Sequence, residues 1–294
     1  MPDPTPTAPE PSRGPDRAGN PTPGPAGARA PDPARGLFET LLVADGRPIR
    51  ITAHLDRLAG STRELFGQGL PAGLDEAIAD AARPLALGRI RVDLLPEGSD
   101  PDAAGDEPRP PGEGRDRAPA ALRFEIAAGP IDPAIFFPAK ENGADLRTVS
   151  HPEWAGAHKW ADRDWLEEVE AELGETVPLI LAGDEVLEAG RANIFLVADG
   201  ALATPPADGR ILPGTARAAT LALAADLGIP AEERPLHLAD LHSADDLFLT
   251  SSLRGIRPVR SLDGEPLGPT DPVVERLATA LRRRWLDAES AHGG

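Results

Sequence analysis

Apolar and polar residues alternate in several short runs in the first half of the chain. Residues 36–43 and 49–51 flank a turn at Asp45-Gly46, so they predict a β-hairpin. Residues 89–95 and 121–126 alternate in the same way and predict two further strands, with a long flexible loop at about 96–119 between them. Two helices are expected here, one with Thr52 as its N-cap and one over about 74–83.

The second half mixes longer apolar runs with helical spacing. Residues 162–173 predict a helix, and residues 176–181, 193–197 and 246–250 predict strands. A further helix follows residues 212–217 and ends at Gly228, which is a natural residue after a helix C-terminus. The chain closes with a helix whose apolar residues share one face, namely Val274, Leu277, Ala278, Leu281 and Trp285.

These elements predict an α+β protein in two parts. We expect a first domain at 36–150, a linker at 151–156 where Pro and Gly interrupt the periodicity, and a second domain at 157–290. Residues 1–35 contain eleven prolines and almost no large apolar residue. Such a segment buries too little surface to offset its ordering entropy, so it predicts a disordered tail.

Charge and cysteine content exclude several functions. The formal net charge is −18, which argues against a nucleic-acid or membrane partner because binding to phosphates needs a basic surface. There is no cysteine, hence no disulfide and no thiolate metal site, and we predict no metal. No apolar run is long enough for a membrane span or a signal peptide, so we expect a cytoplasmic protein.

Lysine is almost absent from this chain. The 30 basic residues include only Lys140 and Lys159, and arginine cannot replace lysine as an amine nucleophile. Lys159 lies between His158 and Trp160, a position that suggests a nucleophile, although on this argument alone the chance retention of a few lysines is the simpler explanation. Lys140 lies in a polar turn and is expected to be solvated.

Three other segments carry candidate chemistry. Glu188 lies between two predicted strands, where a surface carboxylate is the simpler interpretation. Residues 212–217 place Gly and Thr at a helix start, which suits either an anion site or ordinary capping by Thr215. Residues 250–255 offer hydroxyl and amide groups at a strand end, to a ligand or to their own loop.

Taken in order, these motifs resemble one enzyme family. The motifs are Phe38-Glu-Thr-Leu41, His54-Leu-Asp-Arg-Leu58, Lys159, Leu187-Glu-Ala-Gly-Arg-Ala-Asn-Ile-Phe195, Leu212-Pro-Gly-Thr-Ala-Arg217 and Ser251-Ser-Leu-Arg-Gly-Ile-Arg-Pro-Val259. Over about residues 36–286 they are similar to the class IV pyridoxal-phosphate (PLP) enzymes of fold type IV. That family includes branched-chain and D-amino-acid aminotransferases and 4-amino-4-deoxychorismate lyase.

The resemblance implies a role for each matching residue. Lys159 corresponds to the lysine that binds the cofactor as a Schiff base and then transfers protons. Glu188 corresponds to the carboxylate that keeps the pyridine nitrogen protonated. The phosphate group is expected to be held by four residues, namely Arg57, Thr215, Ala216 and Ser252. A homodimer acting on a small amino substrate is also implied.

The motifs are closest to those of the lyase. Thr40 matches a threonine that the lyases carry beside the cofactor, and the segment Ser-Leu-Arg-Gly resembles their last motif. An aminotransferase for a branched-chain or D-amino acid is the first alternative, and a binding protein that kept the fold is another. The chain lacks the Tyr that many relatives use and the Arg-Gly that often ends the strand near Arg123, so Arg254 or Arg257 is the candidate for receiving a substrate carboxylate.

Overall fold

The computed structural model describes residues 22–23, 30–98 and 121–287. Most of the predicted tail and residues 99–119 of the predicted loop therefore lie outside the described residues. The last part of the predicted tail is described, and Pro33–Arg35 form a short 3-10 helix. The Arg35 guanidinium lies 2.9 Å from a carboxylate oxygen of Asp162, so this part contacts the folded chain.

Six helices and two groups of strands are described. The first strand group and its helices are β2 (Leu37–Ala44), β3 (Arg47–Pro48), α1 (Ile51–Phe66), α2 (Leu74–Ala82), β4 (Leu87–Pro96) and β5 (Leu122–Pro130). The second group comprises β1 (Thr22–Pro23), β6 (Ala144–Ser150), α3 (Asp164–Leu173), β7 (Val177–Ala182), β8 (Glu185–Ala189), β9 (Asn193–Ala198), β10 (Ala201–Thr204), α4 (Thr215–Asp226), β11 (Ala231–Glu233), β12 (Leu236–His237), α5 (Leu238–Ser243), β13 (Asp246–Ser251), β14 (Gly255–Leu262), β15 (Glu265–Pro266) and α6 (Pro272–Leu286).

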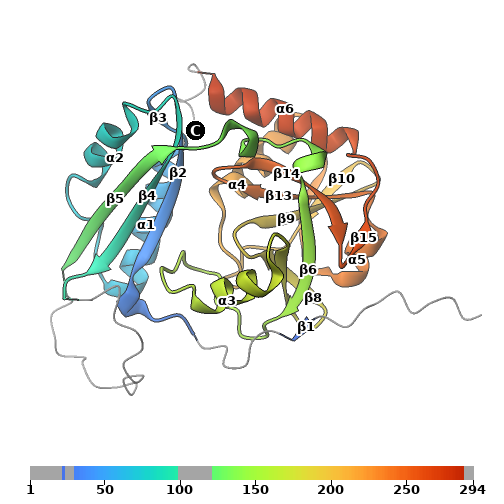
Figure 1. Cartoon of the computed structure of the whole chain (residues 1–294), viewed down its shortest axis with the longest axis horizontal. Coiled ribbons are helices and arrows are strands. Elements are labelled where there is room, and N and C mark those ends of the chain that lie inside the picture. Colours follow the sequence, from blue (N-terminus) through green and yellow to red (C-terminus); the bar gives the residue numbers. More distant parts are fainter. Residues whose placement is uncertain (1–21, 24–29, 99–120, 288–294) are drawn as a thin grey trace, which may run out of the picture.

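The smaller sheet has the order β3-β2-β4-β5 and is antiparallel throughout. Helices α1 and α2 cover one of its faces, where Leu58 and Ile78 pack among Leu41, Ile90 and Val92 (Figure 1). Side chains alternate along β2, so Phe38 and Thr40 point away from these helices. This second face of β2 borders the cavities described below.

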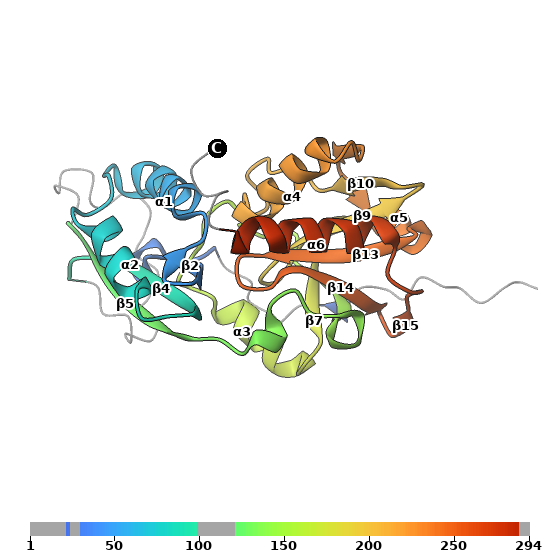
Figure 2. The ribbon, with the colours of Figure 1, turned by 90° about the horizontal axis from the view of Figure 1, so that it is seen from above.

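The larger sheet has the order β11-β10-β9-β13-β14-β6-β7-β8-β12, with β1 beside β6 and β15 beside β14. Helices α4 and α6 pack on one face through a core that includes Phe195, Phe248 and Leu281. Figure 2 shows the two sheets side by side, each with its own helices. This arrangement confirms the predicted α+β class with two parts. Within the described residues, no helix is long and apolar enough to cross a membrane.

Three local predictions differ from the structure. The second strand of the predicted hairpin was placed at residues 49–51, but β3 covers Arg47–Pro48 and residue 51 already belongs to α1. Helix α1 begins at Ile51, and its N-cap is Arg50 in the left-handed conformation (φ 56°), so the assignment of Thr52 as N-cap is wrong. Strand β6 lies inside residues 36–150 but belongs to the larger sheet, where it pairs in parallel with β14 and β7. The chain therefore enters the larger sheet before residue 144. Both of these partners of β6 come later in the sequence than residue 150, so the pattern within residues 36–150 does not indicate this pairing.

Candidate active site

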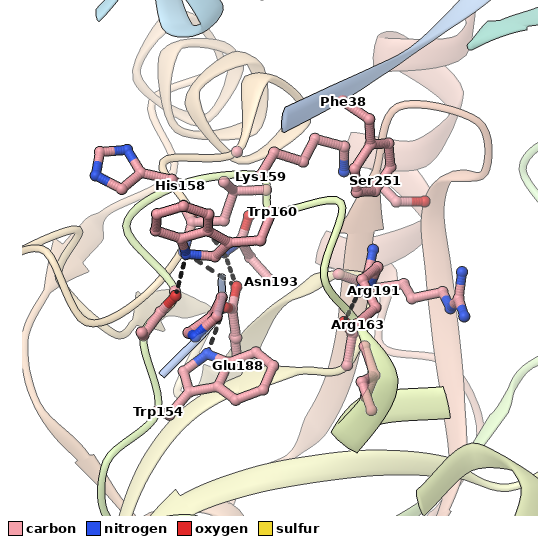
Figure 3. Close-up of a pocket in the computed structure, with 18 of the residues that line it drawn as sticks. Phe38, Trp154, His158, Lys159, Trp160, Arg163, Glu188, Arg191, Asn193 and Ser251 are labelled. Atoms are coloured by element: carbon pink, nitrogen blue, oxygen red, sulfur yellow. Dashed lines mark hydrogen bonds between the residues drawn. The ribbon is translucent and has the colours of Figure 1, made fainter. Parts of the chain in front are cut away.

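Lys159 lies where the two sheets meet. The backbone N–H of Phe38 donates to the Lys159 carbonyl at 2.9 Å, and the N–H of Ala161 donates to Gly36 O at 3.1 Å. The lysine is thus tied to the start of β2, and its Nζ lies 4.6 Å from the centre of the Phe38 ring. Figure 3 shows the side chain extending along the cavity toward that ring.

The environment of Lys159 favours a neutral amine. Burial lowers its pKa to about 7, and the positive charges of Arg57 and Arg163 act in the same direction, against the attraction of Glu39 and Glu188. A neutral amine is the nucleophilic form of lysine. Near neutral pH this side chain is therefore able both to attack an electrophile and to accept a proton.

Glu188, on β8, is also buried and lines the same cavity. Its Oε1 accepts the indole N–H of Trp154 at 2.8 Å, and its Oε2 accepts the Leu212 N–H at 3.2 Å and the Asn193 amide at 3.3 Å (Figure 3). Burial raises its pKa to about 7, although these donors oppose the shift. The carboxylate is thus held by neutral donors, so a cation that binds beside it would stabilise its ionised form.

Glu39 is a second buried carboxylate, on β2, and an arginine and a histidine contact it. It accepts from Arg57 Nε and Nη2 and contacts His54 Nδ1, each at 2.8 Å. Burial is the largest single effect and would raise the pKa of Glu39, but the interactions with Arg57 and His54 together outweigh it and hold the pKa well below its usual range. Glu39 therefore fixes the Arg57 guanidinium from behind.

The start of helix α4 completes this network. Thr215 Oγ1 lies 3.1 Å from His54 Nε2 and 3.3 Å from Ser252 Oγ, and Arg57 Nη1 donates to Pro213 O at 3.1 Å. A helix N-terminus offers free backbone N–H groups to an anion. Arginine, two hydroxyl groups and this helix start therefore surround one end of the cavity with donors.

The predicted site residues occupy two adjoining cavities. The inner cavity is lined by all the predicted cofactor-binding residues, namely Lys159, Glu188, Arg57, Thr215, Ala216 and Ser252. The predicted Thr40, Arg254 and Arg257 line a wider outer cavity instead. Phe38, Lys159 and Ser252 border both cavities, so the lysine lies at the boundary between them.

The outer cavity is rich in arginine. Its lining includes seven arginines and three glutamates, namely Arg89, Arg91, Arg163, Arg191, Arg254, Arg257 and Arg260 with Glu141, Glu170 and Glu175. Arg257 donates to Gly143 O at 2.8 Å, while its buried Nε has no hydrogen-bond partner among the described residues. Burial lowers the pKa of Arg257 to about 10, and the neighbouring Arg254 and Arg260 add to this effect. Such a wall is suited to carboxylates.

Several residues of the site were not found from the sequence. Glu39 and His54 lie inside quoted motifs, but their contact joins a strand to a helix, which no local pattern reveals. Trp154 belongs to the predicted linker. Lys140, predicted to be solvated, instead donates to the buried Asp246 at 3.0 Å, so that prediction is wrong; the carboxylate needs a cation in its buried position.

The inner cavity has the donor set that PLP needs. One end holds Arg57, two hydroxyl groups and the α4 N-terminus, which suit a phosphate. The same cavity holds the buried Glu188 carboxylate, which suits a protonated ring nitrogen, and Lys159, which suits a covalent bond to the cofactor. Thr250 also lines this cavity, and its buried hydroxyl has no hydrogen-bond partner among the described residues. The residues present therefore fit the cofactor.

Comparison with known proteins agrees with this reading of the cavity. Residues 36–262 match the amino-transferase class IV family, and the chain belongs to that family. It is a PLP-dependent enzyme with the fold of the type IV class, and both lyases and aminotransferases share this architecture.

Individual relatives include both activities. A putative branched-chain-amino-acid aminotransferase of Methanocaldococcus jannaschii is 28% identical over 276 residues, 88% of each chain. A probable one of Synechocystis is 36% identical over 115 residues, 39% of this chain and 37% of that protein. The structure of 4-amino-4-deoxychorismate lyase from Pseudomonas aeruginosa is 27% identical with a TM-score of 0.68, covering 85% of this chain and 91% of that one. A PLP-bound hypothetical aminotransferase from Mycobacterium tuberculosis is 25% identical with a TM-score of 0.70, covering 88% and 94%.

Proposed function

We propose that this enzyme is a 4-amino-4-deoxychorismate lyase, which eliminates pyruvate and leaves 4-aminobenzoate. The observation that carries the proposal is the arginine-rich outer cavity beside Lys159. The substrate of that reaction carries two carboxylates, one on the ring and one on the pyruvate to be released. Arg254 and Arg257 are the candidates for receiving one of them, as charge-assisted hydrogen bonds to guanidinium are strong.

Each proposed catalytic side chain has a distinct task. PLP, when bound, supplies an electron sink that stabilises negative charge next to the substrate nitrogen. Lys159 holds the cofactor and, as a neutral amine, accepts the proton from the amine-bearing ring carbon of the substrate. Glu188 keeps a proton on the pyridine nitrogen. Thr40 orients the departing pyruvate from β2.

The phosphate group of the cofactor is assigned to the donor end of the inner cavity. Arg57 approaches it from α1, while Thr215 and Ala216 contribute the start of α4 and Ser252 a hydroxyl group. Glu39 holds the Arg57 guanidinium in position at 2.8 Å. Both parts of the chain supply these groups, so both are needed to form the phosphate site.

A second candidate is an aminotransferase for a branched-chain or D-amino acid. It is favoured by the relatives named as branched-chain aminotransferases, one of which aligns over 88% of this chain. That reaction leaves the amino group on the cofactor, so a keto acid is needed to complete each cycle. The lyase reaction restores the bond to Lys159 without an acceptor. This requirement separates the two activities.

The test supplies 4-amino-4-deoxychorismate to the PLP-loaded enzyme with no keto acid present. We expect continuous and equal release of pyruvate and 4-aminobenzoate, measured by a coupled reductase assay and by fluorescence. If neither product appears, and a small amino acid instead gives one turnover that resumes only on adding a keto acid, the enzyme is an aminotransferase.

We also expect a cytoplasmic homodimer with the active site near the subunit interface. The resemblance to this enzyme family implies the dimer, and the apolar content of residues 37–51 and 122–126 supports it indirectly. Light scattering at micromolar concentration is expected to give twice the mass of the 30.8 kDa chain. A monomeric mass under these conditions would contradict the prediction.

A further inference from the structure

The segment predicted as a linker, residues 151–156, lies against Glu188 in the inner cavity. We infer that Trp154 in this segment is a positioning residue for the cofactor, whose indole N–H holds the Glu188 carboxylate ionised and in a fixed orientation. The inference rests on the proposed role of Glu188 toward PLP. It assigns a task to a tryptophan that no motif contains.

The Trp154 bond is the shortest of the three that Glu188 accepts. The indole nitrogen lies 2.8 Å from Oε1, against 3.2 Å and 3.3 Å for the two donors to Oε2. The Asn193 amide nitrogen also donates to Leu212 O at 2.9 Å, so it is shared. Trp154 therefore is the only one of these donors that binds Oε1, and it fixes the rotation of the carboxylate.

The indole is itself held firmly. The ring of His151 contacts both Trp154 and Trp165, with centroids 5.5 Å and 4.4 Å away, and the two tryptophan rings are 5.7 Å apart. The backbone N–H of Trp154 donates to His151 O at 3.2 Å, and the N–H of His151 donates to Leu181 O at 2.8 Å. A side chain packed in this way loses little further freedom when it donates.

A second residue of this segment, Gly156, also lies close to Glu188. A Cβ on Gly156 would lie 2.6 Å from Glu188 Oε1, so only glycine fits there. Two cations act on Glu188 at longer range, Arg163 of α3 and Lys159. Burial raises the pKa of Glu188, and the Trp154 hydrogen bond is the strongest effect that opposes it. Loss of this bond therefore favours the neutral carboxyl.

Trp154→Phe removes the donor, and Trp165→Phe is its matched control. Both substitutions remove an indole from the same aromatic cluster, but the Trp165 nitrogen has no hydrogen-bond partner among the described residues. A hydrogen bond to a charged group is stronger than one between neutral groups. Its loss in Trp154→Phe is therefore expected to raise the PLP dissociation constant at pH 7 about tenfold. For Trp165→Phe we expect a change of less than about twofold.

The pH dependence of PLP binding separates positioning from a general loss of packing. We expect the pH at which binding is half-maximal to move upward in Trp154→Phe and to stay unchanged in Trp165→Phe. Equal behaviour of the two variants, or tighter binding by Trp154→Phe because the indole competes with the cofactor, would overturn the inference. Glu188→Gln is also measured. If it binds PLP as the parent does, the proposed role of Glu188 fails and this inference fails with it.

A measurement on the parent protein covers the case in which Trp154→Phe does not fold. The chain has four tryptophans, so nitrogen-15 labelling of tryptophan gives four indole N–H resonances. We expect one of them to shift as Glu188 titrates and to lose that response in Glu188→Gln. Four resonances that all ignore this substitution would overturn the inference.

Discussion

Glu39 and Glu188 are both buried in the core of the site, yet their ionisation is governed in opposite directions. Glu39 contacts the Arg57 guanidinium and the His54 ring at 2.8 Å, and these two partners together hold its pKa well below the usual range despite burial. Glu188 contacts only neutral donors directly, so burial prevails and its pKa is raised to about 7. Burial alone therefore does not set the ionisation of a carboxylate, because its hydrogen-bond partners and their charges also shift its pKa.

The two carboxylates suit two different tasks. A carboxylate that is always ionised is a fixed support for an arginine that binds a phosphate. A carboxylate whose pKa lies near 7 is stabilised in its ionised form when a cation, such as a protonated ring nitrogen, binds beside it. The negative charges of both carboxylates act on the pKa of Lys159. The two parts of the chain thus contribute complementary electrostatics to one cavity.

Glu39→Gln is expected to weaken the contact that holds the Arg57 guanidinium in position. Removing one partner of a buried ion pair leaves an uncompensated charge on Arg57, which costs about 3–5 kcal/mol of unfolding free energy. Denaturant unfolding of the PLP-free protein measures this loss. Saturating PLP is expected to restore part of it, because its phosphate group offers Arg57 a new partner. A loss below about 1 kcal/mol would show that Arg57 does not depend on Glu39.

The pH dependence of stability sharpens the contrast at Glu188. Its folded pKa of about 7 lies above the unfolded value of 4.5, so the folded PLP-free protein binds the proton more tightly. Its contribution is fully present below pH 4.5 and is lost as the pH rises to about 7, by about 3 kcal/mol. Glu39 acts in the opposite sense, because its folded pKa is lowered and its contribution is lost only in acid.

Unfolding of the PLP-free protein between pH 4.5 and 7 measures this effect. We expect the stability difference between the parent and Glu188→Gln to change with pH over this window in favour of the variant. A difference that does not vary with pH would place the titration elsewhere.

At pH 7 in the PLP-loaded enzyme, Glu188→Gln is expected to lower turnover about a hundredfold. The amide still accepts the Trp154 N–H but does not keep a proton on the ring nitrogen, so the electron sink weakens. The variant remains folded, as judged by circular dichroism, and although it binds PLP more weakly than the parent it still takes up PLP that is supplied in excess. Turnover equal to that of the parent would return Glu188 to a structural role.

Thr40→Ala gives the smallest expected effect. Thr40 follows Glu39 on β2 but points to the outer cavity. We expect turnover of 4-amino-4-deoxychorismate to fall about tenfold, since one hydrogen bond is lost, with the PLP dissociation constant unchanged. Thr40→Ser, which keeps the hydroxyl, is the control. A change in PLP affinity as large as the change in turnover would move Thr40 into the cofactor site.

Local patterns in the sequence predicted much of the fold. The continuous apolar run of β13 and the amphipathic face of α6 are both recognisable from local spacing, and both elements are present. Strand β14 was not predicted, because Arg257, Pro258 and Arg260 interrupt its apolar pattern and its partner β6 is more than a hundred residues away. Strand pairing over such distances leaves no trace in local periodicity.

Local motifs likewise predicted residues of the candidate site but not the contacts between them. Lysine scarcity and motif order identified Lys159, while Glu188 and Arg57 followed from the motifs alone. The contacts that tune them could not be predicted, since Glu39 meets Arg57 across a strand and a helix. Trp154 meets Glu188 from a segment whose Pro and Gly indicate only a break in periodicity. Which side chains share a cavity is decided by packing.

The most direct test of this account is borohydride reduction of the PLP-loaded enzyme followed by peptide mass spectrometry. The chain has only two lysines, Lys140 and Lys159, so the outcome is unambiguous. Lys140 is held by Asp246, whereas Lys159 lines the inner cavity and has its pKa lowered to about 7. The account predicts the pyridoxyl label on Lys159 alone. Label on Lys140, or no label at all, would contradict it.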